Sequence, residues 1–174
     1  MAFLQIRLEG SKCIVGLGHI GLEVAKRLEA FDCIILYNSR KKNYLFHVCE
    51  LATYSNVLVV RCTLTAKTHH MINKKVSLAL GRDGVTVNVR CGAIIDEEEM
   101  VQCLVQREIK GAGLDVFENE SEVLKVLFGL DNVVLSPHQA DTTEDYFKDL
   151  SDLAVANLEA FFSNKPLLSE GVND

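Results

Sequence analysis

The chain has 174 residues, of which 48% are apolar and 24% charged, with a net charge of −6. This length and balance are typical of one globular α/β domain with a substantial core. The acidic charge argues against a nucleic-acid-binding surface, and no apolar run reaches the length of a membrane span. Six scattered cysteines without a C-x-x-C pair favour reduced thiols over disulfides. The first ten residues lack the pattern of a secretory signal, so we expect a cytoplasmic location.

Short apolar runs alternate with segments of helical periodicity along the whole chain. The predicted strands and helices alternate in the order 13–15, 19–30, 33–37, 45–52, 57–60, 68–80, 85–89, 96–107, 112–116, 122–128, 132–135 and 142–163. Near-continuous apolar strands are typical of a parallel sheet covered on both faces. We therefore predict an α/β fold of the Rossmann type, a doubly wound sheet of six strands in the order 3-2-1-4-5-6 with helices on both faces.

Two helix starts carry the pattern of a capping box. Asp96 is followed by Glu99, and Asp141 is followed by Glu144 at the same spacing. Both pairs predict that a helix begins directly after the first acidic residue.

A glycine-rich turn joins the first predicted strand to the first predicted helix. It has the sequence Gly16-Leu17-Gly18-His19-Ile20-Gly21. In this context the first glycine permits a sharp turn, the second lets a pyrophosphate approach the backbone, and the third allows close packing of helix on strand. The helix N-terminus offers free N–H groups to phosphates. The turn therefore predicts a dinucleotide site, with a turn that only packs as the alternative.

A polar, basic cluster follows the second predicted strand, where NAD-preferring sites usually have an acidic residue. It begins Asn38-Ser39-Arg40 and continues with two lysines. Arg40 is suited to pair with a ribose 2′-phosphate, and Ser39 to donate a hydrogen bond to it. We therefore expect NADP(H) as the preferred cofactor, with NAD(H) possible and a solvated basic loop as the alternative.

Three further motifs follow in order in the second half. They are the stretch 87–96, the stretch 111–120 with Phe117-Glu118-Asn119-Glu120, and Ser136-Pro137-His138. Together with the glycine turn they resemble the cofactor domain of the D-isomer-specific 2-hydroxyacid dehydrogenases over about residues 10 to 170. Within that family the wording is most similar to plant NADPH-dependent hydroxypyruvate/glyoxylate reductases.

The resemblance implies roles for particular residues. His138 matches the general acid of carbonyl reduction, and Glu120 matches the carboxylate that holds it. A neighbouring carboxylate stabilises imidazolium, which suits proton donation near neutral pH. Asp115 matches the residue that contacts the nicotinamide carboxamide. Thr65, with Thr68, is a weaker candidate to line the nicotinamide side.

The chain departs from the family at the position of its carboxylate-binding arginine, where it has Cys91. Cysteine lacks the charged, bidentate fork of arginine. Arg90 is one residue away, and adjacent side chains of an extended strand point to opposite faces. Arg90 is therefore a possible substitute only where the strand gives way to the loop.

Two adjacent histidines, His69 and His70, have no sequence neighbours at metal-ligand spacing. They are interpreted as exposed residues of the predicted helix 68–80, and no metal site is predicted.

Two further residues, Ser121 and Gln139, also depart from the pattern of the family that the chain resembles.

About ten residues precede the first strand, whereas the family has a substrate domain there. We interpret 1–10 as a short remnant and 11–174 as the dinucleotide-binding domain, with the substrate domain absent.

Three hypotheses about function follow from these observations. The first is a reductase that transfers hydride from NADPH to hydroxypyruvate or glyoxylate. The second is a catalytically impaired cofactor-binding module that forms a homodimer or pairs with a full-length relative. The third, motivated by the short first strand, is a poorly folding chain.

Overall fold

The structure is a computed structural model that describes residues 10–39, 48–120, 122–140 and 142–169. The chain divides into two compact units, residues 1–138 and 139–174, which are described separately. Among the helices of the described ranges, none is both long and apolar enough to cross a membrane.

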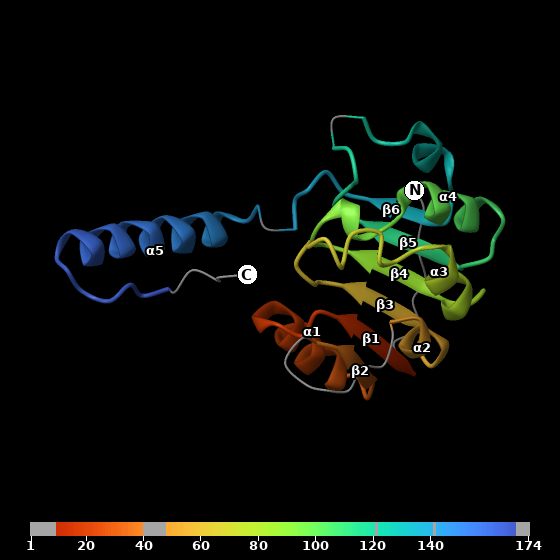
Figure 1. Cartoon of the computed structure of the whole chain (residues 1–174), viewed down its shortest axis with the longest axis horizontal. Helices are drawn as coiled ribbons and strands as arrows, with labels where there is room; N and C mark the ends of the chain where they lie inside the picture. Colours follow the sequence, from red (N-terminus) through yellow and green to blue (C-terminus); the bar gives the residue numbers. More distant parts are fainter. Residues whose placement is uncertain (1–9, 40–47, 121, 141, 170–174) are drawn as a thin grey trace. The chain divides into compact units, whose positions relative to one another are not determined.

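The first unit contains a six-stranded parallel sheet (Figure 1). The strands are β1 (Ser11–Val15), β2 (Ile34–Asn38), β3 (Val57–Val60), β4 (Val85–Asn88), β5 (Gly111–Leu114) and β6 (Val133–Leu135). The predicted fold class and number of strands are confirmed. The first strand has five residues rather than the three that the sequence predicted, and it pairs with a neighbour on each side.

The predicted strand order is wrong, because β3 pairs with β1 rather than with β2. The observed order is β2-β1-β3-β4-β5-β6. The helix that joins β1 to β2 and the helix that joins β2 to β3 cover opposite faces of the sheet. A right-handed crossover must change direction when it changes face. The chain therefore returns past β1 after β2, and the strand order reverses between β1 and β3.

The helices of this unit are α1 (His19–Glu29), α2 (Val48–Thr53), α3 (Lys74–Leu80) and α4 (Glu97–Val105), with the short 3₁₀ helices η1 (Gly92–Ile94) and η2 (Lys125–Gly129). Of these, α3 and α4 are shorter than the sequence predicted. The segment 66–70 is a hydrogen-bonded turn and not the first part of a helix. The helix that the sequence predicted over 68–80 therefore begins six residues later than expected, at Lys74.

The core has two parts because the apolar side chains of each strand alternate between faces. Cys13 and Val15 of β1 pack in the larger cluster with α2, α3 and α4. Ile14, between them, packs in a smaller cluster with Ala25 of α1. Helices on both faces bury β1, as a central parallel strand requires.

The second unit contains α5 (Glu144–Phe162). Its N-cap is Thr143, whose hydroxyl oxygen accepts a hydrogen bond from the Tyr146 N–H at 3.2 Å. The helix therefore begins two residues later than predicted. Asp141, the predicted cap, lies outside the described residues.

Candidate functional site

The glycine turn follows β1 at the carboxyl edge of the sheet, where a parallel fold collects its functional loops. Gly16 has a φ of +105°, and a Cβ added there would lie 2.4 Å from the Cys62 amide nitrogen. A Cβ added at Gly21 would lie 2.3 Å from the Gly16 carbonyl oxygen. Both glycines are therefore required by close backbone contacts, as their positions in the motif predict.

The middle glycine has the opposite environment. A Cβ added at Gly18 would meet nothing within 4 Å, so the turn faces open space at this point. Gly18 is the N-cap of α1, no described side chain caps this end, and the first turn contains no acidic residue. His19 and Ile20, the first helical residues, are exposed. The uncapped N–H groups and the open turn fit the phosphates of a dinucleotide.

The end of β2 lies beside this turn. The Gly16 N–H donates to the Asn38 carbonyl oxygen at 3.0 Å. Asn38 and Ser39 are both half-buried. Arg40 lies outside the described residues, so its pairing with a 2′-phosphate stays a prediction.

His138 and Glu120 are brought together from the ends of two adjacent strands. His138 Nδ1 lies 3.0 Å from the Glu120 carboxylate, and both side chains are about half exposed, at 53% and 48%. His138 has a φ of +52°, and its backbone N–H donates to the Asp115 carbonyl oxygen at 2.8 Å. The left-handed backbone turns the chain after β6, so that the imidazole meets the carboxylate. The pairing that the resemblance implied is present.

Asp115 follows β5 and is buried. Its carboxylate accepts a hydrogen bond from the Ser136 hydroxyl, and its backbone N–H donates to the Asn88 carbonyl oxygen at 3.0 Å. The ends of β4, β5 and β6 are therefore tied together around this residue. Asp115 is held beside the backbone that carries His138.

Asn88 organises the loop that carries Arg90 and Cys91. Its side-chain amide donates to the Cys91 carbonyl oxygen at 2.9 Å, and its side-chain oxygen accepts from the Arg90 N–H at 3.1 Å. Cys91 is half-buried, whereas Arg90 is exposed. Sequence reasoning did not select Asn88 as a site residue. The signal in the sequence is an asparagine in an apolar run, which is typical of a turn.

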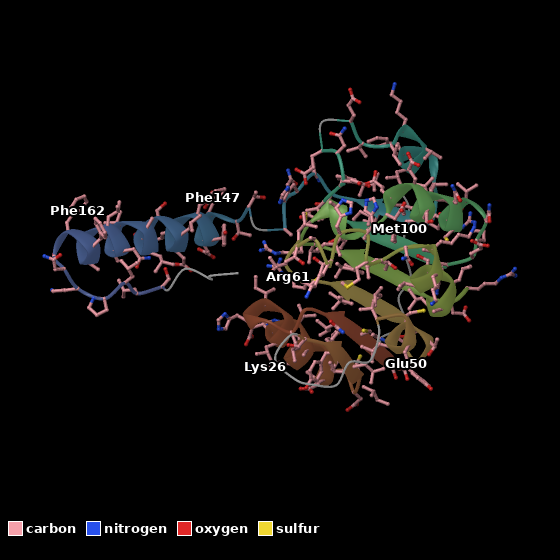
Figure 2. All side chains as sticks on the ribbon, viewed as in Figure 1. Lys26, Glu50, Arg61, Met100, Phe147 and Phe162 are labelled. Carbon is pink, nitrogen blue, oxygen red and sulfur yellow. The ribbon has the colours of Figure 1, made fainter. Side chains whose placement is uncertain are left out.

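Arg61 is a second residue that sequence reasoning missed. It follows β3, and its Nη1 donates to the Val89 carbonyl oxygen at 3.3 Å. Figure 2 shows it at the carboxyl edge of the sheet. This places a cation beside the loop of Cys91, the position at which the resemblance implies an arginine. A charged residue directly after a buried apolar strand is the signal that marks it.

Thr65 and Thr68 build a turn. Thr68 Oγ1 accepts from the Thr65 N–H at 2.7 Å and donates to the Thr63 carbonyl oxygen at 2.8 Å. The two hydroxyl oxygens lie 3.1 Å apart. Such hydrogen bonds compete with those of a helix. A role of Thr65 at the nicotinamide stays a prediction.

The interpretation of His69 and His70 as helix residues is wrong. They lie in the turn 66–70, and His70 has a φ of +51°. His70 Nε2 lies 2.6 Å from Glu118 Oε1, so His70 has a partner 48 residues away. No pattern of spacing along the chain predicts that contact.

Comparisons with known proteins identify the family of the chain. Residues 2–140 match the model of the D-isomer specific 2-hydroxyacid dehydrogenase, NAD binding domain. A glyoxylate/hydroxypyruvate reductase of Arabidopsis thaliana is 56% identical over 162 residues, which are 90% of this chain and 50% of that protein. A hydroxyphenylpyruvate reductase of Plectranthus scutellarioides is 54% identical, over 90% of this chain and 52% of that protein.

A solved structure gives the same result. The NADPH-dependent glyoxylate/hydroxypyruvate reductase of Sinorhizobium meliloti, in complex with NADP and malonate, aligns with a TM-score of 0.88 and 38% identity. The alignment covers 94% of this chain and 53% of that one. The chain thus spans about half the length of the curated relatives it matches.

Proposed function

Because the chain belongs to the D-isomer specific 2-hydroxyacid dehydrogenase family, whose NAD-binding domain it matches over residues 2–140, we propose that it serves the reduction of a small 2-oxo acid by a nicotinamide dinucleotide. Hydroxypyruvate and glyoxylate are the proposed substrates. The observation that carries the proposal is the His138–Glu120 pair, 3.0 Å apart and anchored to Asp115. The names of the similar reductases from Arabidopsis thaliana and Sinorhizobium meliloti support these 2-oxo acids as the substrate class.

The residues of the glycine turn fit the cofactor. When bound, the dinucleotide supplies the hydride. Gly18 leaves the turn open to the pyrophosphate, and the uncapped N-terminus of α1 faces the same space. Asn38 and Ser39 are the residues proposed to contact the adenosine ribose, and Asp115 is the residue proposed to contact the nicotinamide carboxamide. We propose NADP(H) over NAD(H), because Ser39 and Arg40 stand where an NAD site has an acidic residue.

His138 is the proposed proton donor. Glu120 engages Nδ1, and Nε2 is the nitrogen proposed to give a proton to the alkoxide that forms from the carbonyl. Glu120 also fixes the orientation of the ring. The proposed proton transfer needs one catalytic histidine and one positioning carboxylate, and the chain has both.

The substrate carboxylate has no bidentate partner at position 91, because Cys91 cannot form the arginine fork. Losing a donor that also stabilises oxyanion charge lowers rates by about 10²–10³. Arg90 is exposed and Arg61 contacts the Val89 carbonyl, so two cations flank the position. This feature favours a second candidate function: a cofactor-binding module without turnover of its own, which forms a homodimer or pairs with a full-length relative.

The deciding experiment measures two quantities on the purified chain. NADPH consumption with hydroxypyruvate, against a blank without substrate, measures turnover. NADPH binding is followed by the fluorescence of the nucleotide itself, since the chain has no tryptophan. We expect binding in both the wild type and His138→Asn, and turnover only in the wild type.

The alternatives give distinct results. Binding without turnover in a folded wild type supports the cofactor-binding module, and co-elution with a full-length relative in size-exclusion chromatography then tests the pairing. A folded sample that neither binds NADPH nor turns over contradicts both candidates. The cytoplasmic location stays a prediction of the sequence.

A further inference from the structure

The turn that carries His69 and His70 is firmly built. The His69 N–H donates to the Thr65 carbonyl oxygen at 3.0 Å. The His70 N–H donates to the Ala93 carbonyl oxygen, also at 3.0 Å. Directly after it, Ile72 and Ile95 form a parallel bridge. The backbone of both histidines is therefore fixed to the segment between β4 and α4 before any ligand arrives.

Glu118 is brought to the histidines by a close approach of two backbones. A Cβ added at Gly92 would lie 1.8 Å from the carbonyl carbon of Phe117 and 2.2 Å from the Glu118 amide nitrogen. That amide donates to the buried Glu97 carboxylate at 2.9 Å. Glu118 therefore has a fixed backbone, while its side chain remains one-third exposed.

The polar atoms of these three side chains converge. One nitrogen of His69, one nitrogen of His70 and one carboxylate oxygen of Glu118 all lie within 4.8 Å of one another. The closest pair is His70 Nε2 and Glu118 Oε1, at 2.6 Å. A tetrahedral ion with bonds of about 2.0–2.1 Å holds its ligand atoms roughly 3.3 Å apart. His70 Nε2 and Glu118 Oε1 therefore have to move apart by about 0.7 Å to accept such an ion.

A carboxylate supports the cluster from behind. Asp96 Oδ2 lies 3.5 Å from His70 Nδ1, on the other side of the ring from Glu118. Histidines that bind metals commonly donate their second N–H to such a carboxylate, which fixes the tautomer and raises ligand basicity. The imidazoles of His69 and His70 are stacked, with centroids 3.9 Å apart, so both rings lie on the same side of the turn.

We propose that His69, His70 and Glu118 form a binding site for a divalent transition-metal ion of the zinc class. Two imidazoles and one carboxylate are a ligand set that Zn²⁺ accepts, with water as the fourth ligand. The negative charges of Glu118 and Asp96 favour the cation. The site is separate from the His138–Glu120 pair, although Glu118 and Glu120 are two residues apart on one segment. An ion here would tie that segment to the turn 66–70.

The test is a titration of the chelator-treated chain with Zn²⁺ by calorimetry, and with Co²⁺ by visible absorption. We expect saturable binding of one ion per chain at this site. His69→Ala and Glu118→Gln should each weaken Zn²⁺ binding at least tenfold. Asp96→Asn should weaken it by about 10–100-fold, because it removes the supporting charge but no ligand.

Two controls separate this cluster from other histidines. His19→Ala changes an exposed histidine outside the cluster and should leave the affinity unchanged. His138→Ala removes the other histidine–carboxylate pair and should also leave it unchanged. Far-UV circular dichroism checks that each variant is folded, and His69→Gln replaces any that is not. Equal Zn²⁺ affinity in the wild type and a folded His69 variant would overturn the proposal, as would loss of binding in His138→Ala alone.

Discussion

Gly92 illustrates how a single residue can determine the position of a functional segment. Its α-hydrogen faces the backbone of Phe117 and Glu118, where no side chain fits. The same segment continues to Glu120, the partner of His138. A residue without a side chain therefore helps to set the place of the segment that carries Glu120, the proposed partner of His138 in catalysis.

We expect Gly92→Ala to lower the free energy of unfolding by about 1–3 kcal/mol, because a methyl group there forces two backbones apart. Urea denaturation followed by circular dichroism measures the change. Gly129→Ala is the matched control, since a Cβ at Gly129 meets nothing within 4 Å. Similar losses in the two variants would mean that the contact with Phe117 is not responsible.

Cys91 gives a second prediction for a single residue. Cys91→Arg places a guanidinium on the loop that Asn88 holds, where it can bind the substrate carboxylate. We expect it to raise kcat/KM for hydroxypyruvate by about 10²–10³. Cys91→Met, which is long but neutral, should not raise it. If Cys91→Arg leaves the rate unchanged, this position does not limit turnover, and Arg61 becomes the next residue to test.

The contacts between residues distant in sequence are those that the sequence predicted least well. The His138–Glu120 pair was predictable only because the order of motifs resembles a known family. His70 and Glu118 carry no such signal, since their approach depends on the path of the chain between β4 and β5. Arg61 and Asn88 were missed although Arg61 directly follows β3 and Asn88 ends β4, because neither residue type alone is specific for a site.

Among the elements, α4 shows how a capping signal can be partly right. The Asp96 side chain accepts from the Glu99 N–H at 3.0 Å, as the capping box predicts. Glu99 does not reach back to the Asp96 N–H, which instead donates to the Ile72 carbonyl oxygen. The Glu99 carboxylate accepts from the Lys74 N–H at 2.7 Å and so caps the start of α3. The two residues of the predicted capping box therefore connect the start of α4 to the start of α3.

Asp96→Ala is expected to lower the free energy of unfolding by about 1 kcal/mol, because it removes the acceptor at the N-cap of α4. Asp96→Asn keeps an acceptor oxygen at the N-cap. Its expected loss in the free energy of unfolding is therefore only a few tenths of the loss in Asp96→Ala. Thermal and urea denaturation of both variants measure the difference. An equal loss in both would assign the effect to the charge rather than to the cap.

The errors at this scale have local physical causes. The predicted helix 68–80 begins late because hydroxyl groups of Thr65 and Thr68 satisfy the backbone of the turn. Helical periodicity alone does not reveal this competition. The strand order was wrong because alternation of strands and helices does not say which face each helix covers. The apolar residues of α2 fit either face until the packing of β1 is known.

For the whole molecule, the response to pH depends on thiols in the core. Burial raises the pKa of Cys13 to about 12 and that of Cys103 to about 11. Both ordinarily lose their proton near pH 9. Between pH 9 and 12 the unfolded chain therefore binds fewer protons than the native one, and the free energy of unfolding falls as pH rises.

Cys13→Ala tests this prediction. It should flatten the fall in the free energy of unfolding between pH 9 and 12, as measured by urea denaturation at fixed pH values. Burial lowers the pKa of Lys12, which acts in the opposite direction below its ordinary value of 10.5. Lys12 is present in both proteins, so the difference between the two profiles isolates the thiol. Parallel profiles would contradict the prediction.

The parallel sheet also has a practical consequence for handling the protein. Every strand of the described sheet runs in the same direction, so the groups proposed for chemistry follow carboxyl ends, whereas connections such as 81–84 and 106–110 lie at the opposite edge. Arg82 and Asp83 are exposed at a turn on that edge. A fluorophore or a surface tether attached there would leave the glycine turn, the His138–Glu120 pair and the His69–His70 turn open to solution. Immobilised assays of cofactor and metal binding can therefore share one attachment point.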